Sequence, residues 1–138
     1  MAQPWAELIT RERVLELHQE GMIGYGDEAG GVPDSADECV DGAIGNAWTA
    51  ALYREPEEAV RGLCFLTHLL MYLVRDHCFT DGNKRVAWLS AMEVLASKRL
   101  TLAASADEAE DFMRQVIVEN LSADEVTAWM ADRLEWIH

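Results

Sequence analysis

The sequence has few basic residues, few prolines and no long apolar run, and each shortage excludes a class of protein. Lys and Arg number 11 against 25 Asp and Glu, which gives a net charge of −14. Such an acidic chain is a poor general partner for nucleic acid or an anionic membrane, because both present phosphates that attract basic surfaces. No apolar run approaches the roughly 20 residues that span a bilayer. The N-terminus also lacks the basic start and apolar stretch of a secretory signal.

Cysteine is equally scarce. The chain has three, Cys39, Cys64 and Cys78, with wide spacing and no Cys-x-x-Cys pair. An odd, scattered set argues against a disulfide framework and against a zinc ribbon. The four histidines also lack the spacing of a zinc site. We therefore expect reduced, buried thiols in a protein of the cytoplasm.

What the chain does contain is enough apolar material for one core. Half of its 138 residues are apolar, which excludes a disordered chain. The length suits one domain, and short connections leave no room for a second, so we expect a single domain over residues 1–138. Helix-forming Ala, Leu, Glu and Arg dominate, without long β-branched alternation. The expected fold class is all-α.

Capping signals and apolar spacing divide the chain into about six helices. Ser35, Ser105 and Ser122 each begin a Ser-Ala-Asp-Glu run, which is a capping-box pattern. The third helix is apolar on most of its circumference and should be the longest and most central. The expected helices cover residues 11–20, 35–51, 57–76, 83–97, 105–119 and 122–136.

Glycine is concentrated in one place. Residues Gly21–Pro33 hold five of the nine glycines in the chain. The pattern is typical of a flexible connection between two helices, and equally of a flap that covers a binding site. Both interpretations stay open at this point.

The segment that indicates chemistry is His77-Cys78-Phe79-Thr80-Asp81-Gly82-Asn83-Lys84-Arg85. A histidine can act as a general base near neutral pH, and Asp81 offers the hard oxygen that suits Mg²⁺ held together with phosphates. The run from Gly82 opens a helix, where unpaired backbone N–H groups face any anion. Lys84 and Arg85 add positive charge there, against the helix dipole. Base, metal ligand and phosphate cradle fall within nine residues.

Each of these residues has an ordinary structural explanation when taken alone. A histidine beside an apolar helix is commonly structural, and an Asp-Gly-Asn turn or a Lys-Arg pair is commonly solvated. The combination in this order favours a functional loop. Cys78 as a thiol nucleophile is the weaker interpretation, because neighbouring side chains at a helix end point apart from His77.

The same segment resembles the signature loop of the Fic/Doc family, His-x-Phe-x-Asp/Glu-Gly/Ala-Asn-Gly/Lys-Arg. His77, Phe79, Asp81 and the run Gly82–Arg85 carry the resemblance. Lys84 stands where the adenylylating Fic branch usually has glycine, and Trp88 replaces the second arginine of that branch. Both differences resemble the death-on-curing (Doc) toxin branch. The N-terminal region of that branch is also similar to the runs Leu15-Glu16-Leu17-His18, Tyr25-Gly26 and Gly31-Val32-Pro33-Asp34.

The resemblance implies a compact all-α bundle of about six helices, with the loop between two central antiparallel helices. It implies that His77 deprotonates an acceptor hydroxyl, that Asp81 holds Mg²⁺ and that Phe79 anchors the loop. The phosphates of ATP would be bound by Gly82, Asn83, Lys84 and Arg85. A flap that docks the target would include Tyr25, Gly26, Gly31 and Val32.

For the Doc branch the implied reaction is transfer of the γ-phosphoryl group of ATP to a threonine of elongation factor Tu, with growth arrest. The implied regulator is a small antitoxin resembling Phd. No convincing Ser/Thr-x-x-x-Glu-Gly/Asn inhibitory pattern is found in the expected terminal helices, which favours control by a separate chain. Protein adenylylation is the alternative reaction. A regulatory or binding protein with weak catalysis is the alternative of another class.

Overall fold

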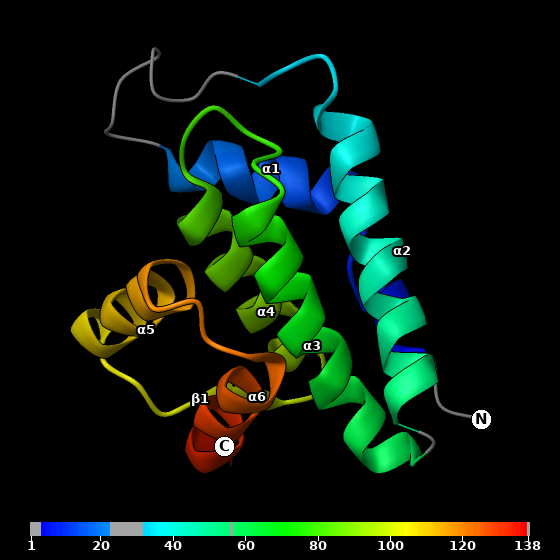
Figure 1. Ribbon diagram of the computed structural model, residues 1–138, viewed down its shortest axis with the longest axis vertical. Helices are drawn as coiled ribbons and strands as arrows, with labels where there is room; N and C mark the ends of the chain where they lie inside the picture. Colours follow the sequence, from blue (N-terminus) through cyan, green and yellow to red (C-terminus); the bar gives the residue numbers. More distant parts are fainter. Residues whose placement is uncertain (1–3, 23–31, 56, 138) are drawn as a thin grey trace.

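The computed structural model describes residues 4–22, 32–55 and 57–137, apart from the side chain at position 59. Six α-helices make up most of this part of the chain, so the predicted all-α class is confirmed (Figure 1). The elements in chain order are η1 (Trp5–Leu8), α1 (Arg11–Gly21), α2 (Ala36–Arg54), α3 (Glu58–Arg75), α4 (Asn83–Ser97), β1 (Leu100–Leu102), α5 (Ala106–Val118), α6 (Ala123–Arg133) and β2 (Leu134–Trp136).

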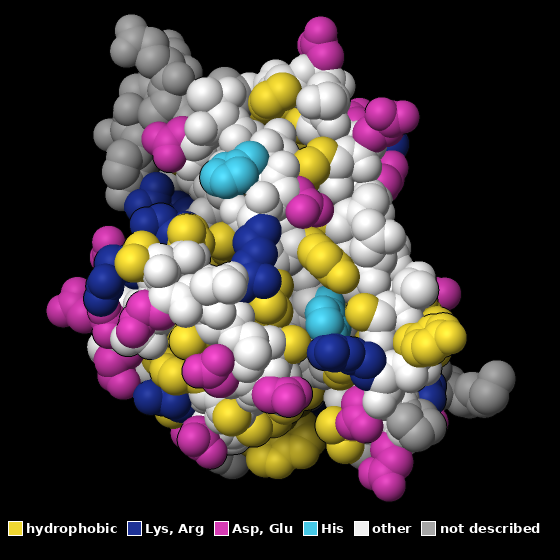
Figure 2. Space-filling model, in the orientation of Figure 1, with side chains coloured by type: hydrophobic (Ala, Val, Ile, Leu, Met, Phe, Trp, Pro, Cys, Tyr) yellow, Lys and Arg dark blue, Asp and Glu magenta, His cyan; other side chains and the backbone are white. Residues whose placement is uncertain are grey.

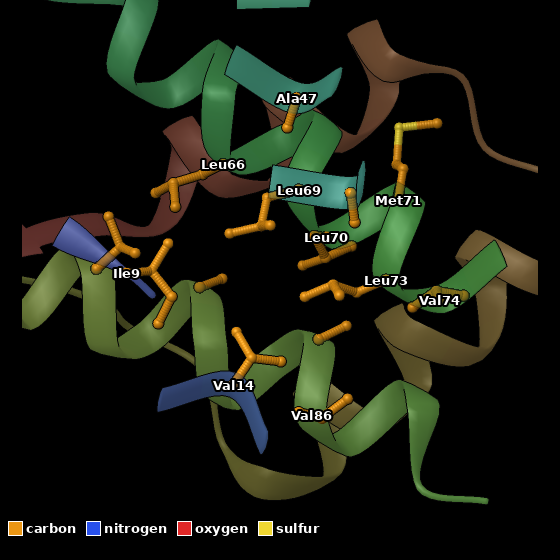
Figure 3. Packing of buried hydrophobic residues seen from close by; sticks show 14 of the residues in the cluster. Ile9, Val14, Ala47, Leu66, Leu69, Leu70, Met71, Leu73, Val74 and Val86 are labelled. Atoms are coloured by element: carbon orange, nitrogen blue, oxygen red, sulfur yellow. The ribbon is translucent and has the colours of Figure 1, made fainter. Parts of the chain in front are cut away.

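Helix α3 runs through the middle of the bundle, with α2 on one side and α4 and α6 on others (Figure 1). Its leucines at positions 66, 69, 70 and 73 are fully buried and meet side chains from α1, α2 and α4 (Figure 3). Each such side chain stabilises the fold by about 1.5–3 kcal/mol. The prediction of a central, buried third helix is confirmed. The prediction that it is longest is wrong, because α2 has 19 residues and α3 has 18.

The side-chain caps predicted from the sequence form at three helix starts and are absent at a fourth. The Thr10 side chain accepts a hydrogen bond from the Arg13 backbone, and complete capping boxes form at Ser105 and Ser122. Ser35 makes no side-chain cap, so that prediction is wrong. The reason is its backbone: Ser35 has helical angles (φ −82°, ψ −1°) within a turn in which Ala36 donates to the Pro33 carbonyl, rather than the extended angles of a cap.

The C-terminal helix ends earlier than predicted. Leu134 has extended backbone angles and begins β2, which pairs antiparallel with β1 in the register Leu100↔Trp136 and Leu102↔Leu134. The expectation of helix through Trp136 is therefore wrong. Strand pairing with residues more than 30 positions earlier replaces the last helical turn, and no local pattern encodes it. The small sheet attaches the end of α6 to the end of α4.

Two of the three cysteines are not reduced thiols. Cys39 near the start of α2 and Cys78 just beyond the end of α3 form a disulfide, and Cys64 is the free cysteine. The prediction of reduced thiols is wrong for this pair, because antiparallel packing of α2 on α3 brings residues 39 apart in sequence to the same end of the bundle. Among the described helices, none has the length and apolar character of a membrane span.

Candidate active site

The motif forms the loop between α3 and α4, and two of its residues have left-handed backbone angles. Gly82 has φ +81°, which glycine adopts freely. His77 has φ +50° and an exposed side chain. A non-glycine residue in this region carries a strain of about 1–2 kcal/mol, and such strain is concentrated at functional sites. The turn at His77 ends α3 and leaves its imidazole at the surface.

Phe79 holds the loop to the core, with a partner that the sequence did not reveal. Its side chain is 2% exposed and stacks on the His18 ring of α1 at a centroid distance of 3.9 Å. The His18 Nε2–H donates to the Asp81 carbonyl oxygen at 2.8 Å. His18 lies on α1, far from the motif in sequence, and only the tertiary structure gives it a place in the loop.

Asn83 closes the loop on itself. Its Oδ1 accepts from the Phe79 backbone N–H at 3.1 Å, and its Nδ2 donates to the Phe79 carbonyl at 2.9 Å. Both ends of the side-chain amide are therefore engaged within the loop. A phosphate-binding contribution from this residue would come from its backbone N–H at the first position of α4.

The start of α4 lacks the groups that usually stabilise a helix N-terminus. No side chain caps it and its first turn holds no acidic residue. Lys84 is exposed there, while the Arg85 guanidinium is half-buried and donates to the Gly21 carbonyl at 2.9 Å. A helix start without a side-chain cap, the positive end of the helix dipole and a lysine are features that can bind an anion. Glycine at position 82 suits this φ, and a Cβ there would also lie 2.6 Å from Met22 Sδ, so that the flexible Met22 side chain would have to move.

Asp81 fits the role of a magnesium ligand shared with phosphates. Its side chain is exposed, and its Oδ1 accepts from the Gly82 N–H at 2.7 Å, which orients the carboxylate and leaves Oδ2 for a cation. In residues 4–22, 32–55 and 57–137, no cluster of three or more His, Cys, Asp or Glu is placed to hold a metal by itself. Mg²⁺ is commonly bound by one or two carboxylates together with substrate phosphates, which matches this donor set.

A second ionisable group adjoins the candidate base. Partial burial raises the pKa of Asp76, the C-cap of α3, while the charged form of His77 acts in the opposite direction. A carboxyl group with a raised pKa therefore lies directly beside the candidate base.

Of the expected flap, Tyr25, Gly26 and Gly31 lie outside the described residues, and Val32 is 54% exposed ahead of α2. Two open hollows of about 360 and 470 Å³ lie elsewhere, between α2, α3 and α6, and within the described structure no motif residue lines them. On the face in Figure 2, His, Lys and Arg side chains are interspersed with Asp and Glu side chains.

The disulfide joins the motif to α2. Cys78 follows His77 directly, precedes the anchor Phe79 and is 2% exposed. Its sulfur is bonded to that of Cys39 in the first turns of α2. The motif is therefore held by α1 through His18 and by α2 through this bridge.

The Fic/DOC family profile matches residues 8–95, a span that includes α1 and the whole loop from His77 to Arg85. The chain belongs to the Fic/DOC family. Within it, the chain is 40% identical over 65 residues to a protein named Toxin Doc from Mycolicibacterium smegmatis, which supports the Doc branch. The match covers 46% of this chain and 50% of that relative, so the chain spans about half the length of the protein it resembles.

Proposed function

We propose that this protein is a Doc-like toxin that transfers the γ-phosphoryl group of ATP to a Ser or Thr hydroxyl of a protein target. The observation that carries the proposal is the junction of α3 and α4. An exposed His77 in a left-handed conformation leads into a helix start that has no cap and no acid but carries Lys84. A general base and an anion site then adjoin in one loop.

In the proposed reaction, a ring nitrogen of neutral His77 accepts the proton of the target hydroxyl. The hydroxyl oxygen forms a bond to the γ-phosphorus while the bond to the β–γ bridging oxygen breaks, and ADP leaves. An imidazole titrates near neutral pH, so its free-base form is available for this step. His77 is exposed, as a base must be to meet a hydroxyl on another protein.

The phosphates would be held by the backbone N–H groups at the start of α4 and by the Lys84 ammonium. Asn83 acts in two ways, since its side chain fixes the loop and its backbone faces the anion. Asp81 would hold Mg²⁺, which when bound neutralises charge on the phosphates. Gly82 permits the close approach of backbone and phosphate.

Two positions favour attack at the γ-phosphorus over the α-phosphorus. Lys84 fills a place where glycine leaves room for a phosphate in the adenylylating branch. Trp88 is half-buried and meets the Trp129 ring of α6 edge to face at 6.2 Å, so this position supplies packing instead of a second arginine. The clamp of the adenylylating pose is therefore incomplete, whereas the backbone N–H groups of Asn83 and Lys84 at the start of α4 would still be available to an anion.

The proposed setting is a toxin–antitoxin pair in the cytoplasm. The relative named Toxin Doc supports this setting, and the resemblance names an antitoxin like Phd as the partner and elongation factor Tu as the target. Growth should stop when the chain is expressed alone and resume when an adjacent small antitoxin gene is expressed with it. Harmless expression of the lone, folded chain would contradict the toxin assignment.

The reaction is tested with ATP labelled at either the α- or the γ-phosphate, incubated with the protein, Mg²⁺ and a bacterial extract. The γ-label should enter a protein band, the α-label should not, and His77→Ala should give neither. Intact-mass analysis distinguishes phosphoryl from adenylyl addition. Incorporation of the α-label would replace phosphorylation by adenylylation. Absence of both labels, together with no binding of Mg-ATP, would favour a regulatory protein.

A further inference from the structure

The disulfide between Cys39 and Cys78 lies next to the candidate general base in the chain. It is attached to the residue directly after His77, and its other end is on a different helix. Disulfides are rare in cytoplasmic proteins, where those that occur are commonly transient and redox-sensing. A bridge in this position and in the proposed compartment therefore requires an explanation beyond fold stability.

The two sulfurs differ in access. Cys39 is half-buried near the start of α2, whereas Cys78 is 2% exposed. An incoming thiolate therefore meets the Cys39 sulfur first, with Cys78 as the leaving thiolate. Cys64 is remote from the bridge in the chain, and burial raises the pKa of its thiol, which keeps it protonated and a poor participant in exchange.

We propose that the Cys39–Cys78 disulfide is a redox modification site that sets the position of His77, the transfer reaction being active when the bridge is closed; this rests on the proposed function. A dithiol reductant opens it in two steps. One reductant thiolate bonds to the Cys39 sulfur as the Cys78 thiolate leaves, and the second reductant thiolate then displaces Cys39. The reductant ends as a disulfide and the protein as two thiols, with two electrons and two protons transferred.

The direction follows from what holds His77. Its left-handed backbone persists only while its neighbours restrain it. On one side is the last turn of α3, and on the other is Cys78, fixed to α2 by the bridge. Phe79 and Asn83 stay anchored when the bridge opens, so the phosphate loop keeps its shape while the histidine gains freedom.

The experiment compares oxidised and dithiothreitol-reduced protein, with thiols counted by alkylation and mass. The γ-label transfer rate should fall about tenfold on reduction, within the roughly 10²-fold that a 1 Å misplacement can cause. Cys39→Ser and Cys39→Ala should match the reduced wild type and not respond to reductant. Cys64→Ser is the matched control and should respond as the wild type does. Equal rates in both wild-type states would overturn the proposal.

A second readout does not depend on transfer. The imidazole NMR signals of His77 are recorded in both redox states, with His68 as the internal control. The signals of His77 should shift or broaden on reduction while those of His68 stay unchanged. An unchanged His77, or a bridge that stays closed in the folded protein under excess dithiothreitol, would overturn the inference. If neither state transfers phosphate, the proposed function fails and these signals alone decide the redox site.

Discussion

The backbone N–H groups at the starts of α5 and α6 are capped by side chains, whereas those at the start of α4 are not. Ser105 and Ser122 cap their helices, and a glutamate three positions on completes each box. Acidic residues also stand in the first turns of α1, α2 and α3. The start of α4 has glycine in the cap position, no acid and a lysine in its first turn.

This difference separates stability from function within one small domain. Capping and an acidic first turn stabilise a helix by satisfying its free N–H groups and its dipole. At α4 no side chain caps those groups, which in the proposed function bind the phosphates of ATP, and the loop is supported by His18 and by the Phe79–Asn83 contacts. Substitutions at the two kinds of helix start should therefore act on different measurements.

The largest effect is expected from His77→Ala, just ahead of α4. Loss of a general base lowers the rate by about 10²–10⁴-fold, and an exposed side chain is removed with little change in the free energy of unfolding. Single-turnover transfer and urea unfolding measure the two quantities. Ser105→Ala is the opposite control, with stability lowered by about 1 kcal/mol and transfer unchanged. A similar rate loss in both variants would break the comparison.

Lys84→Glu gives α4 the acidic first turn of the other helices. Reversal of a charge that contacts phosphate should weaken Mg-ATP binding by at least about tenfold, since hydrogen bonds to charged groups contribute about 1.5–3 kcal/mol. The same change should raise stability by about 0.3–1 kcal/mol through the helix dipole. Calorimetric titration measures the affinity for Mg-ATP, and thermal unfolding measures the change in stability. Unchanged affinity for Mg-ATP would remove Lys84 from the site.

Gly82→Ala tests the backbone that replaces a cap. A side chain at φ +81° carries about 1–2 kcal/mol of strain, and the new Cβ must also displace Met22 Sδ. Gly45→Ala is the matched control at an exposed position of α2, where no atom lies within 4 Å of the new Cβ. This substitution should raise the free energy of unfolding by about 0.5–1 kcal/mol. Urea unfolding of both variants should show opposite signs, and equal effects would contradict the account.

The smallest expected effect is on the loss of folding stability at acidic pH. Hydrogen bonds from Ser105 and Ser122 lower the pKa of Glu108 and of Glu125 below the ordinary value of 4.5. Stabilisation by such groups is complete above the unfolded-state pKa and is lost as the pH falls through the lowered folded-state pKa. Urea unfolding between about pH 6 and about pH 3 should show a smaller loss of stability at acidic pH for Glu108→Gln than for wild type. Identical pH slopes would show that the box contributes nothing.

The sequence predicts those features that short stretches of chain determine. The bounds of α4 match the prediction, and the boxes at Ser105 and Ser122 are confirmed, because capping depends on residues three positions apart. Features that join distant residues were missed. The His18 contact with Asp81 spans 63 positions, and β2 pairs with a strand more than 30 positions earlier in the chain. The chemistry inferred from the motif order stays a prediction, and that order did not reveal the residues that support the loop.

The central claim is that the α4 start binds nucleotide phosphate whereas the capped starts do not. The most direct measurement is an amide NMR titration with Mg²⁺ and a non-hydrolysable ATP analogue. The account predicts saturable shifts at the backbone N–H groups of Asn83 and Lys84, with none at Asp107 or Asp124 in the first turns of α5 and α6. Shifts absent from the α4 start, or equal at all three helices, would contradict it.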